Sequence, residues 1–193
     1  IVAGFSSGEL NAYRYENGRL VWGDALQRTT MSTSVASLSD VDADPVIDGN
    51  QVFALGKGGR MVALELTSGN RIWEQNVGGV STPWVAGEWV FVATDEAKVI
   101  AMNRNNGKIR WIAELRRWRD QGGKSGAIFY SGPVLAGGRL IVAGTNGALI
   151  NIDPATGAVQ SQTGTGDSVT TQPVVAGNTL YILTDGGRLI AYR

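Results

Sequence analysis

The residues most suggestive of chemistry are three aspartates on alternate positions in the run SDVDADP (39–45). EF-hand calcium loops also alternate carboxylates, but they require glycine at the sixth position and glutamate at the twelfth. Counted from Asp40, those positions hold a proline and a glutamine, so the calcium pattern fails. In an extended segment Asp40, Asp42 and Asp44 point to one side, which suits pairing with an arginine or lysine of a partner. The alternative is a solvated loop edge that protects a strand end by its charge.

A second polar segment, LRRWRDQGGKSGAIFYSG (115–132), places Arg116, Arg117 and Arg119 around Trp118. Arginine and tryptophan dominate the energetics of protein interfaces when they are buried, so this segment is a weaker candidate for partner binding. The alternative is a solvated loop with Trp118 folded back onto the protein. The 17 basic and 17 acidic residues of the chain cancel, and three arginines on a neutral chain make a poor footprint for nucleic acid.

Catalytic machinery is harder to find, because the 193 residues include no histidine and no cysteine. The commonest general base, the commonest metal ligand, thiolate metal sites and the usual serine or cysteine triads are therefore excluded. We expect no enzymatic activity, no cofactor and no metal.

A repeat of about 40 residues must position both polar segments. Four copies open with Pro-x4-Gly, and their prolines are Pro45, Pro83, Pro133 and Pro173. A small or polar residue follows 18 positions after each proline, with a glycine six further on in three copies. Four residues beyond that glycine stand Trp73 and Trp111, with Ser161 as the exception, and Trp22 keeps the same frame in a first copy that lacks the proline.

Each copy is expected to form four short antiparallel strands, since runs of valine, isoleucine, leucine and aromatic residues alternate with glycine-bearing turns. This period and strand count predict an all-β protein, a β-propeller of four-stranded blades. We expect Trp22, Trp73 and Trp111 to be structural and to fill the space between blades. The predicted organisation is one propeller segment, 1–193, an incomplete arc of about four to five blades. Its parts are a partial blade 1–26, blades 42–77, 80–115 and 130–165, a partial blade 170–193, and long loops 27–41 and 116–129.

The repeat resembles a known family of propellers. The segments ALELTSGNRIW (63–73), AMNRNNGKIRW (101–111), AYRYENGRLVW (12–22) and the degenerate NIDPATGAVQS (151–161) are similar to the tryptophan-docking repeat of the quinoprotein, or PQQ, propellers. That repeat is specific for the fold and weak for function, because it also occurs in propellers that bind no quinone.

Within that superfamily the chain more closely resembles the BamB family of outer-membrane β-barrel assembly lipoproteins. The resemblance rests on LSDVDADPVIDGNQVFALGKGGRMVALELTSGNRIW (38–73) and on GGRLIAYR (186–193), and it extends along essentially the whole chain, aligned with the later blades of an eight-bladed ring. It implies a non-catalytic scaffold that binds the barrel-inserting subunit BamA through propeller loops, with Asp40 and Asp42 among the contacts. It also implies unfolded outer-membrane proteins as further partners. The segment 115–130 looks longer than the family norm.

The resemblance further implies a place at the periplasmic face of the outer membrane, with a lipid anchor in the full-length protein. No run of about 18 apolar residues occurs, so we expect membrane attachment only through an anchor upstream of Ile1.

Two other functions stay open on the sequence alone. One is the C-terminal part of a PQQ-dependent dehydrogenase, although such enzymes usually carry calcium beside the quinone and often an adjacent cysteine pair. The other is a generic protein-interaction propeller.

Overall fold

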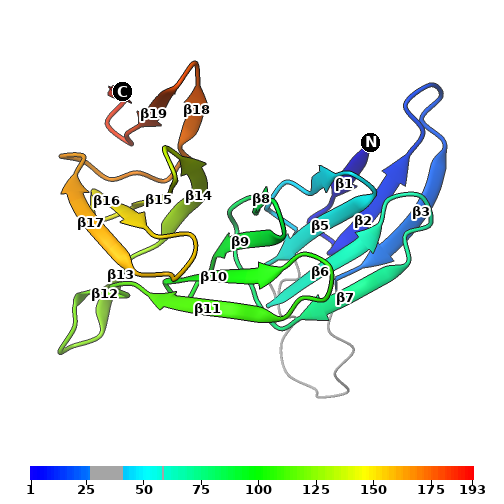
Figure 1. The fold of residues 1–193 in the computed structure, drawn as a ribbon, viewed down its shortest axis with the longest axis horizontal. Coiled ribbons are helices and arrows are strands. Elements are labelled where there is room, and N and C mark those ends of the chain that lie inside the picture. Colours follow the sequence, from blue (N-terminus) through cyan, green and yellow to red (C-terminus); the bar gives the residue numbers. More distant parts are fainter. Residues whose placement is uncertain (27–40, 58) are drawn as a thin grey trace.

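Short antiparallel strands succeed one another along the chain in the computed structural model, which describes residues 1–26, 41–57 and 59–193. The strands form five sheets of three or four strands, lying side by side in chain order, and one separate two-stranded hairpin (Figure 1). Within each of the five sheets every strand pairs with the next one in sequence. The prediction of an all-β protein with four-stranded antiparallel blades is confirmed.

The first two sheets precede residue 76. Sheet 1 has three strands, which are β1 (Val2–Gly4), β2 (Glu9–Tyr13) and β3 (Leu20–Ala25). Sheet 2 has four strands, which are β4 (Val46–Asp48), β5 (Gln51–Gly56), β6 (Arg60–Glu65) and β7 (Arg71–Gln75).

Three further sheets and the hairpin follow. Sheet 3 consists of β8 (Trp84–Ala86), β9 (Trp89–Ala93), β10 (Lys98–Asn103) and β11 (Ile109–Glu114). The hairpin consists of β12 (Trp118–Asp120) and β13 (Ser125–Ala127). Sheet 4 consists of β14 (Tyr130–Ala136), β15 (Arg139–Gly144), β16 (Ala148–Ile152) and β17 (Val159–Gly164). Sheet 5 consists of β18 (Val174–Ala176), β19 (Thr179–Leu183) and β20 (Leu189–Tyr192).

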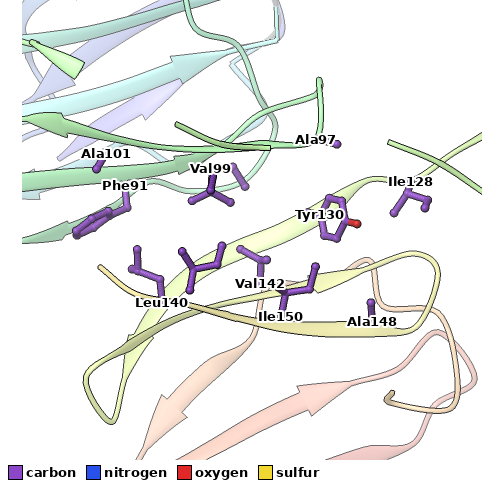
Figure 2. Packing of buried hydrophobic residues seen from close by; sticks show 13 residues of the cluster. Phe91, Ala97, Val99, Ala101, Ile128, Tyr130, Leu140, Val142, Ala148 and Ile150 are labelled. Atoms are coloured by element: carbon purple, nitrogen blue, oxygen red, sulfur yellow. The ribbon is translucent and has the colours of Figure 1, made fainter. Parts of the chain in front are cut away.

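Hydrophobic cores lie between neighbouring sheets, which is why the middle strands of sheets 2, 3 and 4 bury both of their faces. Figure 2 shows the core between sheets 3 and 4, where Phe91 and Val99 face Leu140, Val142 and Ile150. A buried strand with two apolar faces reads as a continuous hydrophobic run rather than an alternating one. Three similar clusters occupy the other sheet-to-sheet interfaces, so each sheet is stabilised mainly by its neighbours.

The two ends of the strands differ in what they carry. In a four-stranded antiparallel meander, the turns between second and third strands lie at the same end as the segments that join one sheet to the next. Sheet 1 lacks the first strand of this pattern, so its β1–β2 turn is the corresponding one and its β2–β3 turn lies at the opposite end. Backbone hydrogen bonds confirm this grouping: Leu26 N donates to Gly8 O, Leu115 N to Ala97 O, Asp95 N to Gly78 O and Thr145 N to Phe129 O. We call this end the connection face. The other end carries the remaining turns and is called the turn face.

The segment 116–129, which the sequence predicts to be a long loop, contains the β12–β13 hairpin instead. Trp118 pairs with Ala127, and Asp120 pairs with Ser125. The reversal needs a left-handed residue, and Lys124 supplies it with φ of 48°. The hairpin projects from the connection face beyond the larger sheets (Figure 1). The predicted loop 27–41 lies, apart from its last residue, outside the described residues.

Candidate partner-binding surface

Asp42 and Asp44 belong to the segment that enters sheet 2, and their neighbours explain their exposure. Val41 and Ala43 are 7% and 2% exposed, whereas both aspartates are exposed to solvent. Side chains of an extended segment alternate between two sides, so burying the apolar residues displays the carboxylates. The predicted common side of Asp42 and Asp44 agrees with this pattern. Asp40 lies outside the described residues.

Two apolar anchors hold this entry segment in place. Val41 packs against Gly4 so closely that a Cβ at Gly4 would lie 2.4 Å from Val41 Cγ1. Val41 N also donates a hydrogen bond of 3.3 Å to Phe5 O. Ala43 belongs to the core between sheets 2 and 3, with Phe53 in the same cluster. The carboxylate of Asp42 is therefore presented from a segment fixed on both sides.

A second group of charges on the connection face includes a neighbour of Asp42. Burial raises the pKa of Asp95, the charge of Lys57 opposes that shift, and the charge of Asp42 adds to it. Asp95 thus lies near both Asp42 and Lys57, although Lys57 and Asp95 come from the second-to-third-strand turns of two different sheets. Beside Asp95, Glu96 accepts a hydrogen bond of 2.8 Å from Lys98 Nζ, which lowers the pKa of Glu96. We call Asp42, Asp44, Asp95 and Glu96 the acidic patch.

Sequence reasoning missed Lys57, Asp95 and Glu96 as neighbours of the aspartate run. The repeat could have pointed to these residues, because the second-to-third-strand turns lie on the connection face, as do the segments that enter each sheet. Among these turns, GKGG (56–59) and TDEAK (94–98) carry Lys57, Asp95 and Glu96. Their grouping with Asp42 depends on how two sheets pack together, which a single repeat does not reveal.

The arginines around Trp118 have distinct roles within the hairpin. Arg116 Nε donates to Trp118 O at 2.9 Å, and the Arg116 guanidinium also bonds to Arg119 O. Arg119 reaches sheet 4, where its guanidinium donates to Thr145 O. Arg117 instead lies over the Trp118 ring, 5.2 Å from the centroid, and is exposed. Two of the three arginines therefore shape the hairpin, and Arg117 stays available to a partner.

Each of the three tryptophans connects its sheet to the next one. The indole Nε1 atoms donate to backbone carbonyls in the following sheet's turn, Trp22 to Leu66 (2.8 Å), Trp73 to Arg104 (2.7 Å) and Trp111 to Pro154 (3.1 Å). The rings also pack on the turn glycines Gly69, Gly107 and Gly157. In each of these tryptophans, the contacts therefore occupy a face of the ring and the indole N–H group.

Metal chemistry finds no support among the described residues, which contain no group of three or more histidine, cysteine, aspartate or glutamate side chains placed to hold an ion. Across the same residues there is no helix long and apolar enough to cross a membrane. The connection face carries an acidic patch and a basic hairpin, and both are suited to binding a charged partner.

The sequence of the chain matches one protein family almost throughout. A model of the family described as "Outer membrane protein assembly factor BamB" matches residues 1–113 and 115–193. Among curated proteins, the BamB of Escherichia coli K12 is 29% identical over 188 residues, which cover 96% of this chain and 45% of that protein. The BamB of Legionella pneumophila is 26% identical over 189 residues, which cover 98% of this chain and 47% of that protein. The chain thus spans about half the length of the curated relatives it matches.

Solved structures show the same fold. The crystal structure of BamB from Moraxella catarrhalis superimposes with a TM-score of 0.81 at 18% identity, covering 100% of this chain and 53% of that one. A computationally designed protein, Ika8, gives a TM-score of 0.71 at 13% identity and covers 99% of this chain. The predicted propeller is confirmed, with the five sheets forming a partial arc of blades.

Proposed function

The chain belongs to the family of the outer membrane protein assembly factor BamB, and on that premise we propose that it is a non-catalytic scaffold of outer-membrane β-barrel assembly. In this proposal the connection face binds the barrel-inserting subunit, a BamA-type protein. Asp40 and Asp42 are the principal contacts, and Asp44, Arg116, Arg117, Trp118 and Arg119 are secondary ones.

The observation that carries the proposal is the anchored display of Asp42. A rigid, exposed carboxylate loses little conformational entropy when it pairs with an arginine or lysine, so it favours a specific contact. Asp95 near Asp42, and Lys57 near Asp95, add further charges of both signs, which determine the partner side chains that fit. Nothing in this arrangement requires a chemical step.

Family membership supports the remaining parts of the proposal. It favours the periplasmic face of the outer membrane as the site of action, with a lipid anchor in the full-length protein. It also favours unfolded outer-membrane proteins as additional clients. The acidic patch favours a contact with a basic region of the barrel subunit over a contact with anionic lipid.

Binding of the purified BamA-type subunit, measured by isothermal titration calorimetry, tests the proposal directly. We expect saturable binding by the wild-type chain and weaker binding by Asp42→Arg, because the substitution places a positive charge against a basic contact. Wild-type affinity in the variant would remove Asp42 from the proposed contact.

A titration with PQQ and calcium, followed by the absorbance of the quinone, separates the scaffold from the dehydrogenase alternative. We expect no saturable spectral change. Saturable micromolar binding would contradict the scaffold assignment.

A further inference from the structure

The β12–β13 hairpin is an addition to the repeat that the core does not need. Trp111 and Pro133 are separated by 22 residues, whereas Trp73 and Pro83, in the corresponding places of the preceding repeat, are separated by 10. Across the hairpin, residues 119–127 are all exposed. An insertion that buries so little contributes little to folding, so its structure needs another explanation.

Specific hydrogen bonds hold this exposed insertion in one conformation. Tyr130 Oη donates to Arg116 O at 3.0 Å, and Ile128 N donates to Arg117 O at 2.8 Å, which closes the base. Phe129 and Thr145 exchange two more bonds, of 3.2 and 3.0 Å, between the base and sheet 4. A two-stranded hairpin alone is marginally stable in water. These ties to the body of the protein preorganise it for binding.

The hairpin is also strongly basic in a chain of zero net charge. Residues 116–127 include four basic side chains and one acidic side chain. That single carboxylate, Asp120, accepts a hydrogen bond from Gly122 N within the turn. Throughout the described residues, no ion pair involves Arg116, Arg117, Arg119 or Lys124. The side chains of Arg117 and Lys124 are exposed and donate no hydrogen bond to the described residues, and the charge of Arg117 contributes to lowering the pKa of Glu96. Both cations are therefore open to solvent and can meet an anionic group.

Apolar surface lies at the base of the hairpin, beside Arg117. The Phe129 side chain is 52% exposed at the base of the hairpin, and Trp118 is half-buried beneath the Arg117 guanidinium. Arginine stacked on an indole keeps the edges of its guanidinium open to a carboxylate. The combination of two free cations with an exposed aromatic ring fits a ligand that carries both carboxylates and apolar side chains.

We propose that the β12–β13 hairpin is a binding arm for an acidic, extended polypeptide segment. Arg117 and Lys124 pair with carboxylates of that segment, and Phe129 receives one of its apolar side chains. The inference gives the hairpin, whose residues the proposed function includes only as secondary contacts of the barrel subunit, a ligand of its own. It does not depend on the proposed contact at Asp42, because it is tested with a peptide in the absence of that subunit.

A protein segment fits better than an anionic membrane, which is the other polyanion of comparable chemistry. Attraction to anionic lipid usually takes a cluster of four to eight basic residues, and the hairpin offers two free ones. A flat membrane touching the connection face would also meet the acidic patch, where Asp42 and Glu96 would repel it. A peptide is narrow enough to contact the hairpin alone.

Fluorescence anisotropy with a labelled synthetic peptide of alternating glutamate and leucine residues tests the proposal, with a peptide carrying glutamine for glutamate as the reference. We expect the glutamate peptide to bind the whole chain at least tenfold more tightly than the glutamine peptide. Arg117→Glu/Lys124→Glu should lose at least tenfold in affinity for the glutamate peptide. The matched control Arg14→Glu/Arg139→Glu makes the same charge change on the turn face and should keep wild-type affinity.

Three outcomes overturn the proposal: no preference of the wild-type chain for the glutamate peptide, equal losses in the hairpin and control variants, or binding to phosphatidylglycerol vesicles without binding to the peptide. Near-ultraviolet circular dichroism establishes that both variants fold. If Arg117→Glu/Lys124→Glu does not fold, Arg117→Gln/Lys124→Gln replaces it. We again expect weaker binding of the glutamate peptide, and a loss no larger than in the control again overturns the proposal.

Discussion

Gly107 is the position at which the coupling between neighbouring blades is best tested. It lies in the β10–β11 turn with φ of +69°, and the Trp73 ring from the preceding sheet packs directly on it. A Cβ at Gly107 would lie 2.8 Å from Trp73 Cδ2, closer than real contacts allow. Gly49 is a matched control, since its φ is +61° and a Cβ there would meet nothing within 4 Å.

The expected magnitudes follow from these two environments. Gly49→Ala carries only the cost of a left-handed backbone with a side chain, about 1–2 kcal/mol. Gly107→Ala adds overpacking, because either the turn or the Trp73 ring must move, and this adds about 1–3 kcal/mol. Moving the ring also strains the 2.7 Å hydrogen bond from Trp73 Nε1 to Arg104 O. We therefore expect Gly107→Ala to destabilise the protein by about 2 kcal/mol more than Gly49→Ala.

Urea unfolding followed by far-ultraviolet circular dichroism measures both variants, in the wild-type chain and in a Trp73→Ala background. Removing the indole removes the steric conflict, so in that background the two glycine substitutions should cost the same free energy of unfolding. Equal costs already in the wild-type chain would refute the argument that the tryptophan contact couples the sheets.

Four further substitutions probe the connection face and the contact between sheets 2 and 3. Asp42→Asn should lower the pKa of Asp95, and Lys57→Met should raise it. NMR titration of the Asp95 carboxyl carbon measures both shifts. Shifts of the opposite sign would contradict the placement of these charges. Because burial raises the pKa of Asp95 in the folded state, the folded protein holds the proton more tightly, and stability falls as pH rises above the ordinary aspartate value of about 3.9. Asp95→Asn should remove that loss in urea unfolding at a series of pH values, and an unchanged pH dependence would contradict it. Arg104→Met should lower the free energy of unfolding by about 2 kcal/mol in the same assay. The reason is that Arg104 donates to Asp48 at 2.5 Å and to Gln51 at 2.8 Å, which joins sheet 3 to sheet 2. An unfolding midpoint equal to that of the wild type would show that these bonds do not stabilise the protein.

Most of the blade architecture can be predicted from the sequence, because the repeat places particular residue types where the backbone geometry requires them. The glycine four residues after each repeat proline must adopt a left-handed turn, and Gly87 and Gly177, with φ of 55° and 54°, do so. The tryptophan slot is equally readable, since a large ring at a fixed distance from a turn glycine implies packing on that glycine.

The exception at Ser161 was visible in the sequence, but its reason was not. Each of the three repeat tryptophans, Trp22, Trp73 and Trp111, stands directly opposite an alanine on the neighbouring strand, as Trp73 stands opposite Ala63. In sheet 4 the same pair is Asn151 and Ser161, and Asn151 Nδ2 donates to Ser161 Oγ at 2.9 Å. The two slots therefore change together, from a small residue beside a ring to a hydrogen-bonded polar pair.

The surface is less predictable, because its contacts join distant segments. Glycines and charged residues at 115–132 predict a loop. The hydrogen bonds of Arg116 and Arg119 to backbone carbonyls, which hold the hairpin and join it to sheet 4, leave no periodic pattern in the sequence. The approach of Asp95 and Lys57 to Asp42 likewise depends on sheet packing.

The most direct test of the central claim is the affinity of the chain for a purified BamA-type subunit, measured by calorimetry for the wild type, for Asp40→Arg/Asp42→Arg and for the control Glu16→Arg/Glu88→Arg. The control makes the same charge change on the turn face, where both glutamates are exposed. We predict a loss of about 2 kcal/mol, roughly 30-fold, for the aspartate variant and wild-type affinity for the control. Unchanged affinity in the aspartate variant, or an equal loss in the control, would contradict the account.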